Sequence, residues 1–507
     1  MTIPAPCPAP YIVWFRQDLR LADNPALHRA VKSGAPVIPL FILEDASDGV
    51  RAPGGAARWW LHHSLESLGE SLSRSGAPLV LRRGIAADIL PALIDETGAG
   101  CVCWNDSFDP AGAARDQHIR TVLSARGVAV ESFNATLLFD PSAIRSKAGK
   151  PFKVFTPFWR TLSTGPEPAH PLPAPTTIMG ICGNSRTEAV SSLQLLPTRP
   201  DWAGGIRESW TPGEAAAAER LHVFLEEIVQ NYRTGRDRPG QDGTSRLSPY
   251  LHWGEISPRQ VWHAAKMRAG TVSERAVEAF LREIGWREFT HSLLQTHPDL
   301  ATEPMDRRFT GLPWRQDPAG LKAWRRGLTG FPIVDAGMRQ LWQTGWMHNR
   351  VRMIVGSFLV KDLLLPWQDG EAWFWDTLVD ADAANNGANW QWVAGCGADP
   401  SPFFRVFNPV LQGEKFDPDG TYVRRFVPEL TKLPARFIHH PWDAPADVLA
   451  KAEIRLGKTY PHPIVDHAAA RDRALDAFRS IRQTARIEAD LTEIDFTESG
   501  QDGEPLA

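Results

Sequence analysis

The chain has 507 residues, 43% of them hydrophobic and 22% charged, and its formal net charge is −4. This composition is typical of a globular protein with about two to four domains. No run of about 18 apolar residues predicts a membrane span, and the first residues lack the basic start and apolar core of a secretory signal, so we expect a cytoplasmic protein. Five scattered cysteines form neither a disulfide framework nor paired zinc ligands, so we expect reduced thiols and no metal.

Charge is distributed unevenly along the chain. Seven acidic residues and no basic residue follow Arg486, so the remainder of the chain is net positive. We therefore expect a basic face on the body of the protein and a disordered acidic tail over 487–507.

Short apolar runs in the first part of the chain alternate with helix-like stretches such as 58–72. The runs span residues 11–15, 37–43, 79–81, 101–104 and 128–130. This alternation predicts a parallel sheet flanked by helices, and hence an α/β domain over 1–135. The string Arg16-Gln17-Asp18-Leu19-Arg20 stands where dinucleotide-binding proteins carry GxGxxG, and the sequence holds no GxxxxGK[ST] loop, which argues against the common nucleotide-binding classes.

Prolines alternate with other residues between 166 and 175, which predicts an interdomain linker over 136–205. From 206 to 486 the apolar pattern is helical and strand-like alternation is scarce. We therefore expect an α/β domain followed by an all-helical domain.

One predicted helix carries a mixed stripe of side chains. Asp335 can cap this helix after Pro332. Spacings of i, i+3, i+4 and i+7 then place an aromatic ring, an amide, a cation and a thioether on one face: Trp346, Asn349, Arg350 and Met353. The stripe suits a ligand wall, and an ordinary amphipathic helix is the alternative.

Glu283, Trp286 and Arg287 repeat the spacing at i, i+3 and i+4 on another predicted helix. A carboxylate beside an indole could bind an uncharged heterocycle through a hydrogen bond and stacking. The alternative is a surface Glu–Arg pair over a half-buried tryptophan, which contributes little to stability.

Residues 240–247 form a hydroxyl-rich turn in front of a predicted helix. Backbone N–H groups and the hydroxyls of Thr244 and Ser245 would suit a pyrophosphate, and plain N-capping is the alternative.

Asp380 and Asp382 lie close to Asn385 and Asn386 in a predicted loop with no basic residue nearby. These carboxylates need outside partners, for which Arg350 and Arg352 are candidates. A metal site is the rival interpretation, but no His or Cys joins them at ligand spacing.

Tryptophan is the most unusual feature of the composition, with 20 Trp against 5 Tyr. Indoles give up an electron readily, and many of them cluster late in the chain. This cluster indicates a redox protein.

Six strings resemble motifs of the photolyase and cryptochrome family, and the resemblance covers nearly the whole chain. They run from Phe15 to Arg20, Gly243 to Ser248, Trp286 to Phe289, Thr329 to Ala336, Trp346 to Arg350 and Phe404 to Pro409. The resemblance implies a Rossmann-like N-terminal α/β domain and an all-helical domain that binds FAD folded into a U.

The resemblance also assigns cofactor contacts. Positions that match those at the FAD phosphates and ribityl chain are Tyr232, Thr244, Ser245, Arg246, Leu247 and Ser248. Further expected cofactor contacts, mostly around the flavin ring, are Arg287, Trp346, Asn349, Arg352, Asp380, Asp382 and Asn386. Asn386 would face flavin N5, Asp382 would accept from the ring's N3–H, and Asp380 would pair with Arg352.

Trp390, Trp367 and Trp314 match the family's electron-transfer chain from the flavin to the surface. Oxidisable indoles in series would let light reduce FAD to its catalytic form.

The resemblance favours DNA repair over signalling. The catalytic residues expected for a cyclobutane pyrimidine dimer are Glu283, Trp286, Met353, Trp392 and Asn386. Two indoles would clamp the flipped lesion and Glu283 would bond a pyrimidine. Contacts to DNA are expected from these pocket residues with Asn349, and from Arg236, Arg350 and Arg405. Photolyases of the (6-4) type carry a second His where Asn349 stands, and plant cryptochromes usually carry Asp in place of Asn386.

The expected activity is light-driven opening of the dimer by an electron from excited reduced FAD. A cryptochrome-like blue-light receptor without repair is the main alternative, and a flavin redox protein independent of light is another. We further hypothesise that Glu283 is partly protonated when the lesion is bound, because a carboxylic acid can donate to a carbonyl. We expect a monomer that binds damaged DNA.

Asn105 and Asp109 resemble positions near a folate antenna, although the acid there is usually Glu. A Lys that the family places shortly after the His297-Pro298-Asp299-Leu300 string is absent. Methenyltetrahydrofolate, a deazaflavin and an empty site therefore all remain open.

Overall fold

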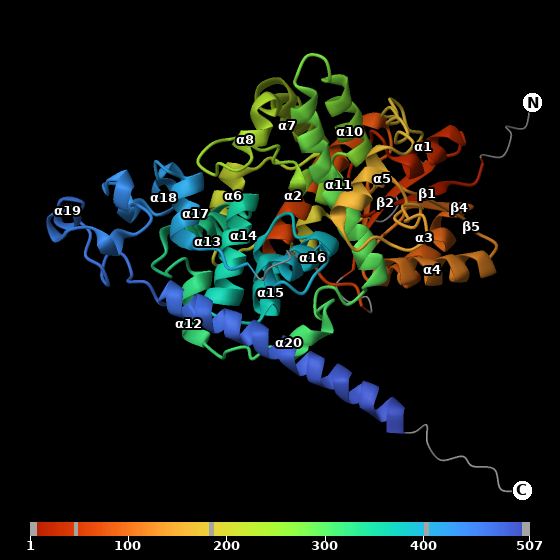
Figure 1. Cartoon of the computed structure of the whole chain (residues 1–507). Helices are drawn as coiled ribbons and strands as arrows, with labels where there is room; N and C mark the ends of the chain where they lie inside the picture. The colour runs from red at the N-terminus through yellow and green to blue at the C-terminus, as the bar shows by residue number, and fades with distance from the viewer. Residues whose placement is uncertain (1–7, 45–48, 182–186, 400–404, 499–507) are drawn as a thin grey trace, which may run out of the picture. The chain divides into compact units, whose positions relative to one another are not determined.

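The computed structural model describes residues 8–44, 49–181, 187–399 and 405–498 (Figure 1). The chain divides into two compact units, each assembled from several stretches of sequence. The first unit takes in residues 1–300, 339–350 and 372–388, and the second takes in 301–338, 351–371 and 389–507. The domain boundaries that we expected near 135, 205 and 486 stay predictions.

A five-stranded parallel sheet lies in the first unit. Its strands are β1 (Tyr11–Phe15), β2 (Val37–Leu43), β3 (Val80–Arg83), β4 (Cys101–Asn105) and β5 (Ala129–Phe133). They lie in the order β3-β2-β1-β4-β5, and each neighbouring pair is parallel. Each apolar run predicted as a strand is one, so the α/β prediction is confirmed.

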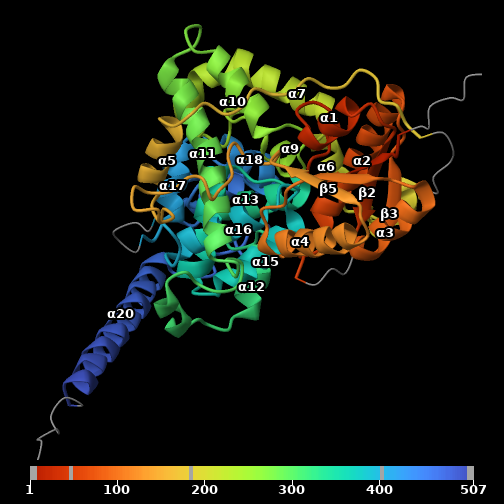
Figure 2. The ribbon, with the colours of Figure 1, turned by 90° about the vertical axis from the view of Figure 1, so that its right-hand side faces the viewer.

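Helices cover both faces of this sheet (Figure 2). Helices α1 (Pro25–Lys32) and α2 (Gly55–Ser75) lie on one face, and α3 (Ala86–Thr97) and α4 (Pro110–Ala125) lie on the other. Asn24 and Asp109 accept hydrogen bonds from backbone N–H groups at the starts of α1 and α4, and a proline follows each cap. Both features stabilise the first turn of a helix.

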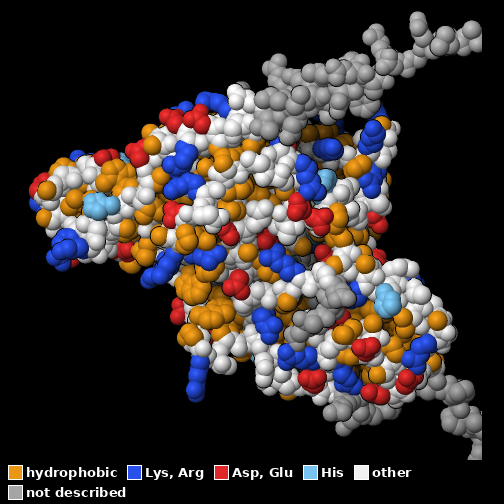
Figure 3. Space-filling view, turned by 90° about the horizontal axis from the view of Figure 1, so that it is seen from below, with side chains coloured by type: hydrophobic (Ala, Val, Ile, Leu, Met, Phe, Trp, Pro, Cys, Tyr) orange, Lys and Arg blue, Asp and Glu red, His pale blue; other side chains and the backbone are white. Residues whose placement is uncertain are grey.

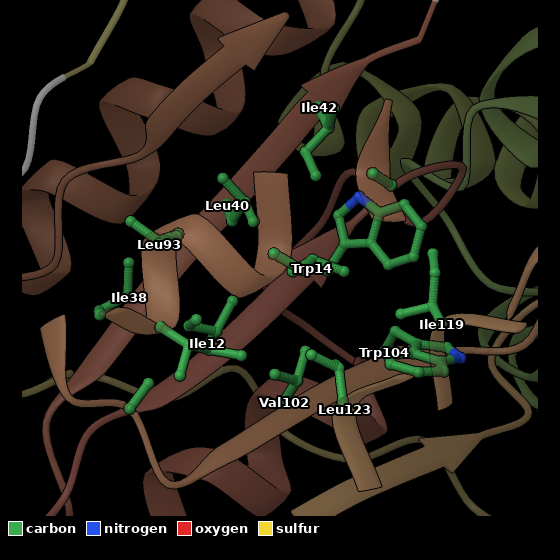
Figure 4. Close-up of a cluster of buried hydrophobic side chains, with 14 of the residues drawn as sticks. Ile12, Trp14, Ile38, Leu40, Ile42, Leu93, Val102, Trp104, Ile119 and Leu123 are labelled. Carbon is green, nitrogen blue, oxygen red and sulfur yellow. The ribbon is translucent and has the colours of Figure 1, made fainter. Parts of the chain in front are cut away.

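The core beneath α3 and α4 is built from alternate residues of the strands (Figure 4). Ile12 and Trp14 of β1 and Val102 and Trp104 of β4 point into it. The rings of Trp14 and Trp104 meet edge to face, with centroids 5.9 Å apart. Burial of a large apolar side chain contributes about 1.5–3 kcal/mol. This packing fixes the register of the strands and therefore the place where their carboxyl ends lie.

The chain after β5 is helical, as predicted. The helices are α5 (Phe155–Ser163), α6 (Gly204–Ser209), α7 (Glu214–Val223), α8 (Tyr232–Gly235), α9 (Ser248–His252), α10 (Pro258–Met267), α11 (Glu274–Thr296), α12 (Pro318–Arg325), α13 (Pro332–Thr344), α14 (Asn349–Ser357), α15 (Trp367–Thr377), α16 (Ala383–Ala394), α17 (Pro409–Phe416), α18 (Thr421–Phe426), α19 (Ala446–Lys451) and α20 (His467–Glu498). Among the described residues of this part, isolated bridges occur but no further strand.

The stripe that we predicted on one helix is divided between two. Helix α13 ends at Thr344, Gly345 follows with φ of 65°, and α14 begins only at Asn349. Trp346 therefore lies outside both helices, and the prediction that it shares a helix face with Met353 is wrong. Glycine adopts this left-handed conformation without a steric penalty, which allows the helix to end there.

Asp335 also differs from its predicted role. It lies inside α13, and its carboxylate accepts hydrogen bonds from the N–H groups of Thr329 at 2.6 Å and Gly330 at 3.1 Å, in the segment before the helix. Asp335, in the first turn of α13, therefore fixes the backbone of the segment that precedes the helix.

The predicted loop over 380–386 is partly helical. Helix α16 begins at Ala383, so Asn385 and Asn386 lie on it, and Asp382 caps it by accepting from the backbone N–H of Asn385 at 2.8 Å. A side-chain cap of this kind contributes about 1 kcal/mol.

The acidic tail differs from the expected disorder over its first part. Helix α20 continues through Glu498, whereas we expected disorder from 487. In the sequence, apolar residues recur at 487, 491 and 494, a spacing that favours a helix. Residues 499–507 lie outside the described part of the chain.

Figure 3 shows one face of the molecule. Basic and acidic side chains of the described residues are interspersed there. This face therefore does not provide the basic surface that we expected from the sequence.

Candidate functional site

A cavity of about 250 Å³ lies at the carboxyl ends of the parallel strands in the first unit. The strand order reverses between β1 and β4, and a sheet of this kind opens a crevice where adjacent connections diverge. Arg16 follows β1, Glu44 follows β2 and Asn105 ends β4, and all three line the cavity. The topology therefore places a ligand-sized space beside the residues that we associated with an antenna.

Cations and flat rings line this cavity. They include Arg16, Arg51, Arg115, Arg287, Trp14 and Trp375. The guanidinium of Arg51 lies 4.1 Å from the centroid of the Trp375 ring. The rings suit a planar ligand, and the charge of the arginines is offset by carboxylates in the same lining, namely Asp18, Glu44, Asp106, Asp109 and Asp382.

Asn105 and Asp109, the expected antenna residues, both line the cavity but already have partners within the protein. Asn105 donates to Asp18 Oδ2 at 2.5 Å and to Asn24 Oδ1 at 2.8 Å. Asp109 accepts from Gly112 N at 2.9 Å, and burial raises the pKa of this carboxyl. These two side chains therefore hold the shape of the cavity.

Asp382 lies in the wall of the cavity beside two histidines. Its Oδ2 atom is 3.8 Å from His252 Nδ1 and 3.6 Å from His291 Nε2, and its Oδ1 atom accepts from Asn385 Nδ2 at 2.7 Å. Burial opposes ionisation, but His291 and His252 hold the pKa of Asp382 well below its usual range. Burial also lowers the pKa of His291. Asp382 is therefore a half-buried anion in a polar network.

The expected phosphate turn lies beside two tryptophans in the first unit. The guanidinium of Arg246 is 4.3 Å from the ring centroid of Trp210 and 5.5 Å from that of Trp346. Trp346 Nε1 donates to Ser248 Oγ at 3.2 Å. Arg246 has φ of 54°, a conformation that costs about 1–3 kcal/mol and concentrates at ligand sites.

The backbone of this turn is held rigidly. Arg220 donates from Nη2 to the carbonyl of Thr244 and from Nε to that of Ser245, each at 2.7 Å. A Cβ atom at Gly243 would collide with the backbone of Gly235. A fixed turn with a guanidinium, hydroxyls and two nearby rings fits the phosphates and rings of FAD.

Glu283 and Trp286 lie one turn apart on α11, as the spacing predicted. The Glu283 carboxylate forms an ion pair with Arg236. The half-buried Trp286 ring stacks on Phe155 of α5, with centroids 3.7 Å apart and an interplanar angle of 10°. One helix therefore presents a flat ring beside a carboxylate.

Arg350 pairs with the residue that follows Arg236. Its Nη2 atom donates to Asp237 Oδ1 at 2.7 Å. Arg287 donates from Nη1 to the carbonyl of Thr136 at 2.7 Å and lines the cavity. Three arginines expected to contact DNA or cofactor thus lie in the first unit.

The other residues of the first unit that we expect to contact the cofactor differ in their burial. Tyr232, Leu247, Asp380 and Asn386 are buried, whereas Asn349 is exposed. Burial raises the pKa of Tyr232. The pairing of Asp380 with Arg352 stays a prediction.

The three tryptophans of the expected electron-transfer chain lie in the second unit. Trp390 and Trp367 are buried and Trp314 is half-buried. Trp324 meets Trp390 edge to face at 6.2 Å, and a Cβ at Gly370 would collide with the Trp390 ring. Burial at one end and exposure at the other suit charge movement to the surface, and the route itself stays a prediction.

The remaining expected residues also lie in the second unit. Arg352, Met353 and Trp392 are half-buried. Arg405 is exposed, and its guanidinium lies 4.7 Å from the Phe407 ring centroid. Phe404, which belongs to the matched string, lies outside the described residues.

The fold has an α/β part and a helical part, the turn beside Arg246 fits a flavin nucleotide, and comparison with known proteins identifies the class as flavin-binding. The family described as the FAD binding domain of DNA photolyase matches residues 280–480, and the DNA photolyase family matches residues 11–176. The chain belongs to the photolyase and cryptochrome family, so the expected family and its FAD-binding domain are confirmed.

Individual relatives cover nearly all of the chain. A deoxyribodipyrimidine photo-lyase of Agrobacterium fabrum is 53% identical over 94% of this chain and 99% of its own length. Cryptochrome-1 of Arabidopsis thaliana is 40% identical over 93% of this chain and 70% of its own length. The crystal structure of a class III photolyase from Agrobacterium tumefaciens, 52% identical, covers 95% of this chain and 100% of its own, with a TM-score of 0.92.

Sequence reasoning missed several residues of these sites. His252 and His291 beside Asp382, Phe155 beneath Trp286, and Asp237 beside Arg350 were not singled out. The only sequence signal for Asp237 is that it follows Arg236 directly.

Proposed function

We propose that this protein repairs cyclobutane pyrimidine dimers in DNA with energy from light. The observation that carries the proposal is the arrangement on α11, where the Trp286 ring, backed by Phe155, lies one turn from the Glu283 carboxylate. An extruded pyrimidine needs a flat surface for stacking and a polar group for its Watson–Crick edge, and this helix supplies both. The likeness to proteins named photo-lyase supports the same activity.

Substrate binding would begin at the DNA backbone. Arg236, Arg350 and Arg405 would contact phosphates, and the dimer would then leave the duplex. Photolyases are among the enzymes that extrude their target base. Extrusion costs a few kcal/mol, least where damage has weakened pairing, and each stacked base returns about 1–3 kcal/mol. Trp286 and Trp392 would supply the stacking surfaces.

Reduced FAD, when excited by light, would supply an electron that opens both bonds of the cyclobutane ring and then returns to the flavin. The residues of this chain would orient the cofactor and the lesion. The Arg246 turn would bind the phosphates, Asn386 would face flavin N5, and Asp382 would accept from N3–H. Trp390, Trp367 and Trp314 would conduct an electron inward from the surface and keep the cofactor reduced.

One assay distinguishes this proposal from the alternatives. A duplex oligonucleotide that contains a single dimer is incubated with the protein, with and without blue light. Repair in the light only supports the lyase. Damage-specific binding without repair would instead favour a cryptochrome-like receptor, which the 40% identity to Arabidopsis cryptochrome-1 keeps as the second candidate. Turnover in the dark with a nicotinamide donor would indicate a flavin redox enzyme.

We also propose that the cavity at the sheet edge holds an antenna chromophore, either methenyltetrahydrofolate or a deazaflavin. Support comes from the aromatic and cationic wall, and from the place of Asn105 and Asp109 in it. Absorption by the purified protein beyond that of its FAD tests this. Trp375→Ala should remove the second chromophore and leave the FAD content unchanged.

We found no candidate membrane-spanning helix in the described part of the chain. The cytoplasmic location and the monomeric state expected from the sequence remain proposals. Size-exclusion chromatography with light scattering tests the second.

A further inference from the structure

Two arginines that we expect to contact DNA phosphates are paired with carboxylates inside the protein. Arg236 pairs with Glu283 on α11. Arg350, at the start of α14, donates to Asp237 Oδ1 from Nη2 at 2.7 Å and from Nε at 3.2 Å. Because Arg236 and Asp237 are consecutive, this one short segment carries both a cation and an anion at the expected DNA surface.

The two carboxylates differ in their surroundings. Glu283 belongs to the proposed lesion pocket, beside Trp286. Asp237 is outside the expected lesion and cofactor residues, and its side chain is 37% exposed, against 21% for Arg350. The carboxylate of Asp237 also offsets the unfavourable position of a cation in the first turn of α14. Asp237 therefore acts on its surroundings mainly through charge.

We propose that Asp237 limits the affinity for the DNA backbone and thereby weakens binding to undamaged DNA. The inference rests on the proposed function, in which Arg350 contacts the DNA backbone. A phosphate that approaches Arg350 must compete with Asp237 for the guanidinium, and it is repelled by the carboxylate. This cost is the same for damaged and undamaged DNA, since both present phosphates.

Only DNA that contains a lesion adds a second source of affinity, because its extruded bases stack in the pocket, whereas undamaged bases remain paired in the duplex. The common cost leaves the ratio of the two affinities unchanged. It lowers non-specific affinity, which comes almost entirely from phosphate contacts, and so limits how long the protein stays on undamaged DNA. The ion pair of Arg236 with Glu283 should also weaken binding to phosphates. Glu283 is expected to contact the lesion as well, so a substitution there would change two interactions at once. Substitution of Asp237 changes only the phosphate contact.

Asp237→Asn keeps the shape of the side chain and removes its charge. We expect this variant to bind undamaged duplex up to about fivefold more tightly, the range of a surface charge worth up to about 1 kcal/mol. One more phosphate contact should also steepen the dependence of log affinity on log salt by about 1. Affinity for dimer-containing duplex should rise by the same factor, so the ratio of the two affinities should stay unchanged.

Two variants serve as controls. Asp237→Glu retains the carboxylate and should behave like the wild type. Asp201 forms an exposed ion pair with Arg207 at 3.0 Å, and neither residue is among the expected DNA contacts, so Asp201→Asn should change neither affinity nor salt dependence. Fluorescence anisotropy with fluorescein-labelled duplexes, at about 50 to 200 mM salt, measures all of them. The FAD absorption spectrum and Tm establish that each variant is folded.

Unchanged or weaker binding of undamaged duplex by Asp237→Asn overturns the inference, since Asp237 would then only position Arg350. Tighter binding by Asp237→Glu also overturns it, because the effect would not come from charge. A wild-type protein that neither prefers nor repairs dimer-containing DNA would instead overturn the proposed function. A wild type that repairs in the light, together with unchanged binding of undamaged duplex by Asp237→Asn, would remove the inference alone.

Discussion

The Trp286 ring lies flat on the Phe155 ring, with centroids 3.7 Å apart and 10° between the planes. Phe155 begins α5 and is fully buried, whereas Trp286 on α11 is half-buried. The two helices pack closely, since a Cβ at Gly285 would lie 2.5 Å from the ring of Trp159. The plane of the Trp286 ring is therefore set by α5 as well as by its own helix.

Phe155→Leu tests whether this stacking prepares the lesion pocket. An aromatic pair contributes about 0.5–1.5 kcal/mol beyond burial, so we expect affinity for dimer-containing DNA to fall about three- to tenfold. KM for the dimer should rise, and the rate at saturating substrate and light should change little. Steady-state repair kinetics under constant blue light measure both.

Phe158→Leu is the matched control for this prediction. Phe158 lies on the same helix and is buried, but it contacts Phe289 at 5.2 Å and not Trp286. If both variants weaken lesion binding equally, α5 acts only as a support, and the orientation of Trp286 is not the cause.

Glu283→Gln tests the protonation hypothesis. In the structure Glu283 forms an ion pair with Arg236. The hypothesis therefore also requires a DNA phosphate to draw Arg236 away from Glu283. Glutamine can donate a hydrogen bond as a carboxylic acid does, so we expect Glu283→Gln to retain much of the repair rate and Glu283→Ala to lose most of it. Normal lesion binding by the Gln variant, with repair no better than that of Ala, would contradict the hypothesis.

The elements that could be predicted from the sequence are those with a strong local period. The run over 37–43 is apolar and rich in β-branched residues, and it is the buried strand β2. The i, i+3, i+4 spacing of Glu283, Trp286 and Arg287 lies on a single helix, as predicted. In both cases the pattern and the structure depend on the same few consecutive residues.

The features that could not be predicted depend on tertiary contacts or on one backbone angle. Gly345 ends α13, yet a glycine inside a helical pattern costs only about 1 kcal/mol and does not by itself mark a break. His252 and His291 approach Asp382 from α9 and α11, and periodicity within one helix carries no information about its neighbours. The contact between Phe155 and Trp286 joins α5, which lies in the predicted linker, to α11. The periodicity of either helix could not reveal this contact.

Lys361 predicts a pH dependence of stability. It is buried in the second unit, where its Nζ atom contacts the carbonyl of Arg405, and burial lowers its pKa to about 7. An unfolded lysine titrates near a pKa of about 10.4. Between these values the unfolded chain binds a proton that the native protein does not, so the free energy of unfolding should rise as the pH increases from about 7 to about 10. This contribution is lost as the pH falls through about 7.

Lys361→Met removes the titrating group and keeps a long side chain. We expect the pH dependence of unfolding to flatten relative to the wild type, measured by urea denaturation across that range. Lys458→Met, at an exposed position, should keep the wild-type slope. Parallel slopes in the Lys361 variant and the wild type would show that the native lysine remains charged.

Trp390→Phe tests the proposed electron route. Phenylalanine is far harder to oxidise than tryptophan, so light-driven reduction of FAD in vitro should be blocked. Repair should continue once the cofactor has been reduced chemically, because the route serves only to prepare it. Absorption spectra during illumination follow the first step, and the dimer assay with dithionite-treated protein follows the second.

Trp324→Phe separates the route from packing. Trp324 meets the Trp390 ring at 6.2 Å but is fully buried, and its indole N–H donates to the carbonyl of Val355 at 3.0 Å. Its replacement disturbs the same core without interrupting a path through Trp367 to Trp314, so photoreduction should persist. Equal loss in both variants would assign the effect to altered packing, and loss of repair by chemically reduced Trp390→Phe would show that Trp390 has a different role. Conduction along Trp390, Trp367 and Trp314 is supported only if Trp390→Phe loses photoreduction but keeps repair, and if Trp324→Phe keeps both.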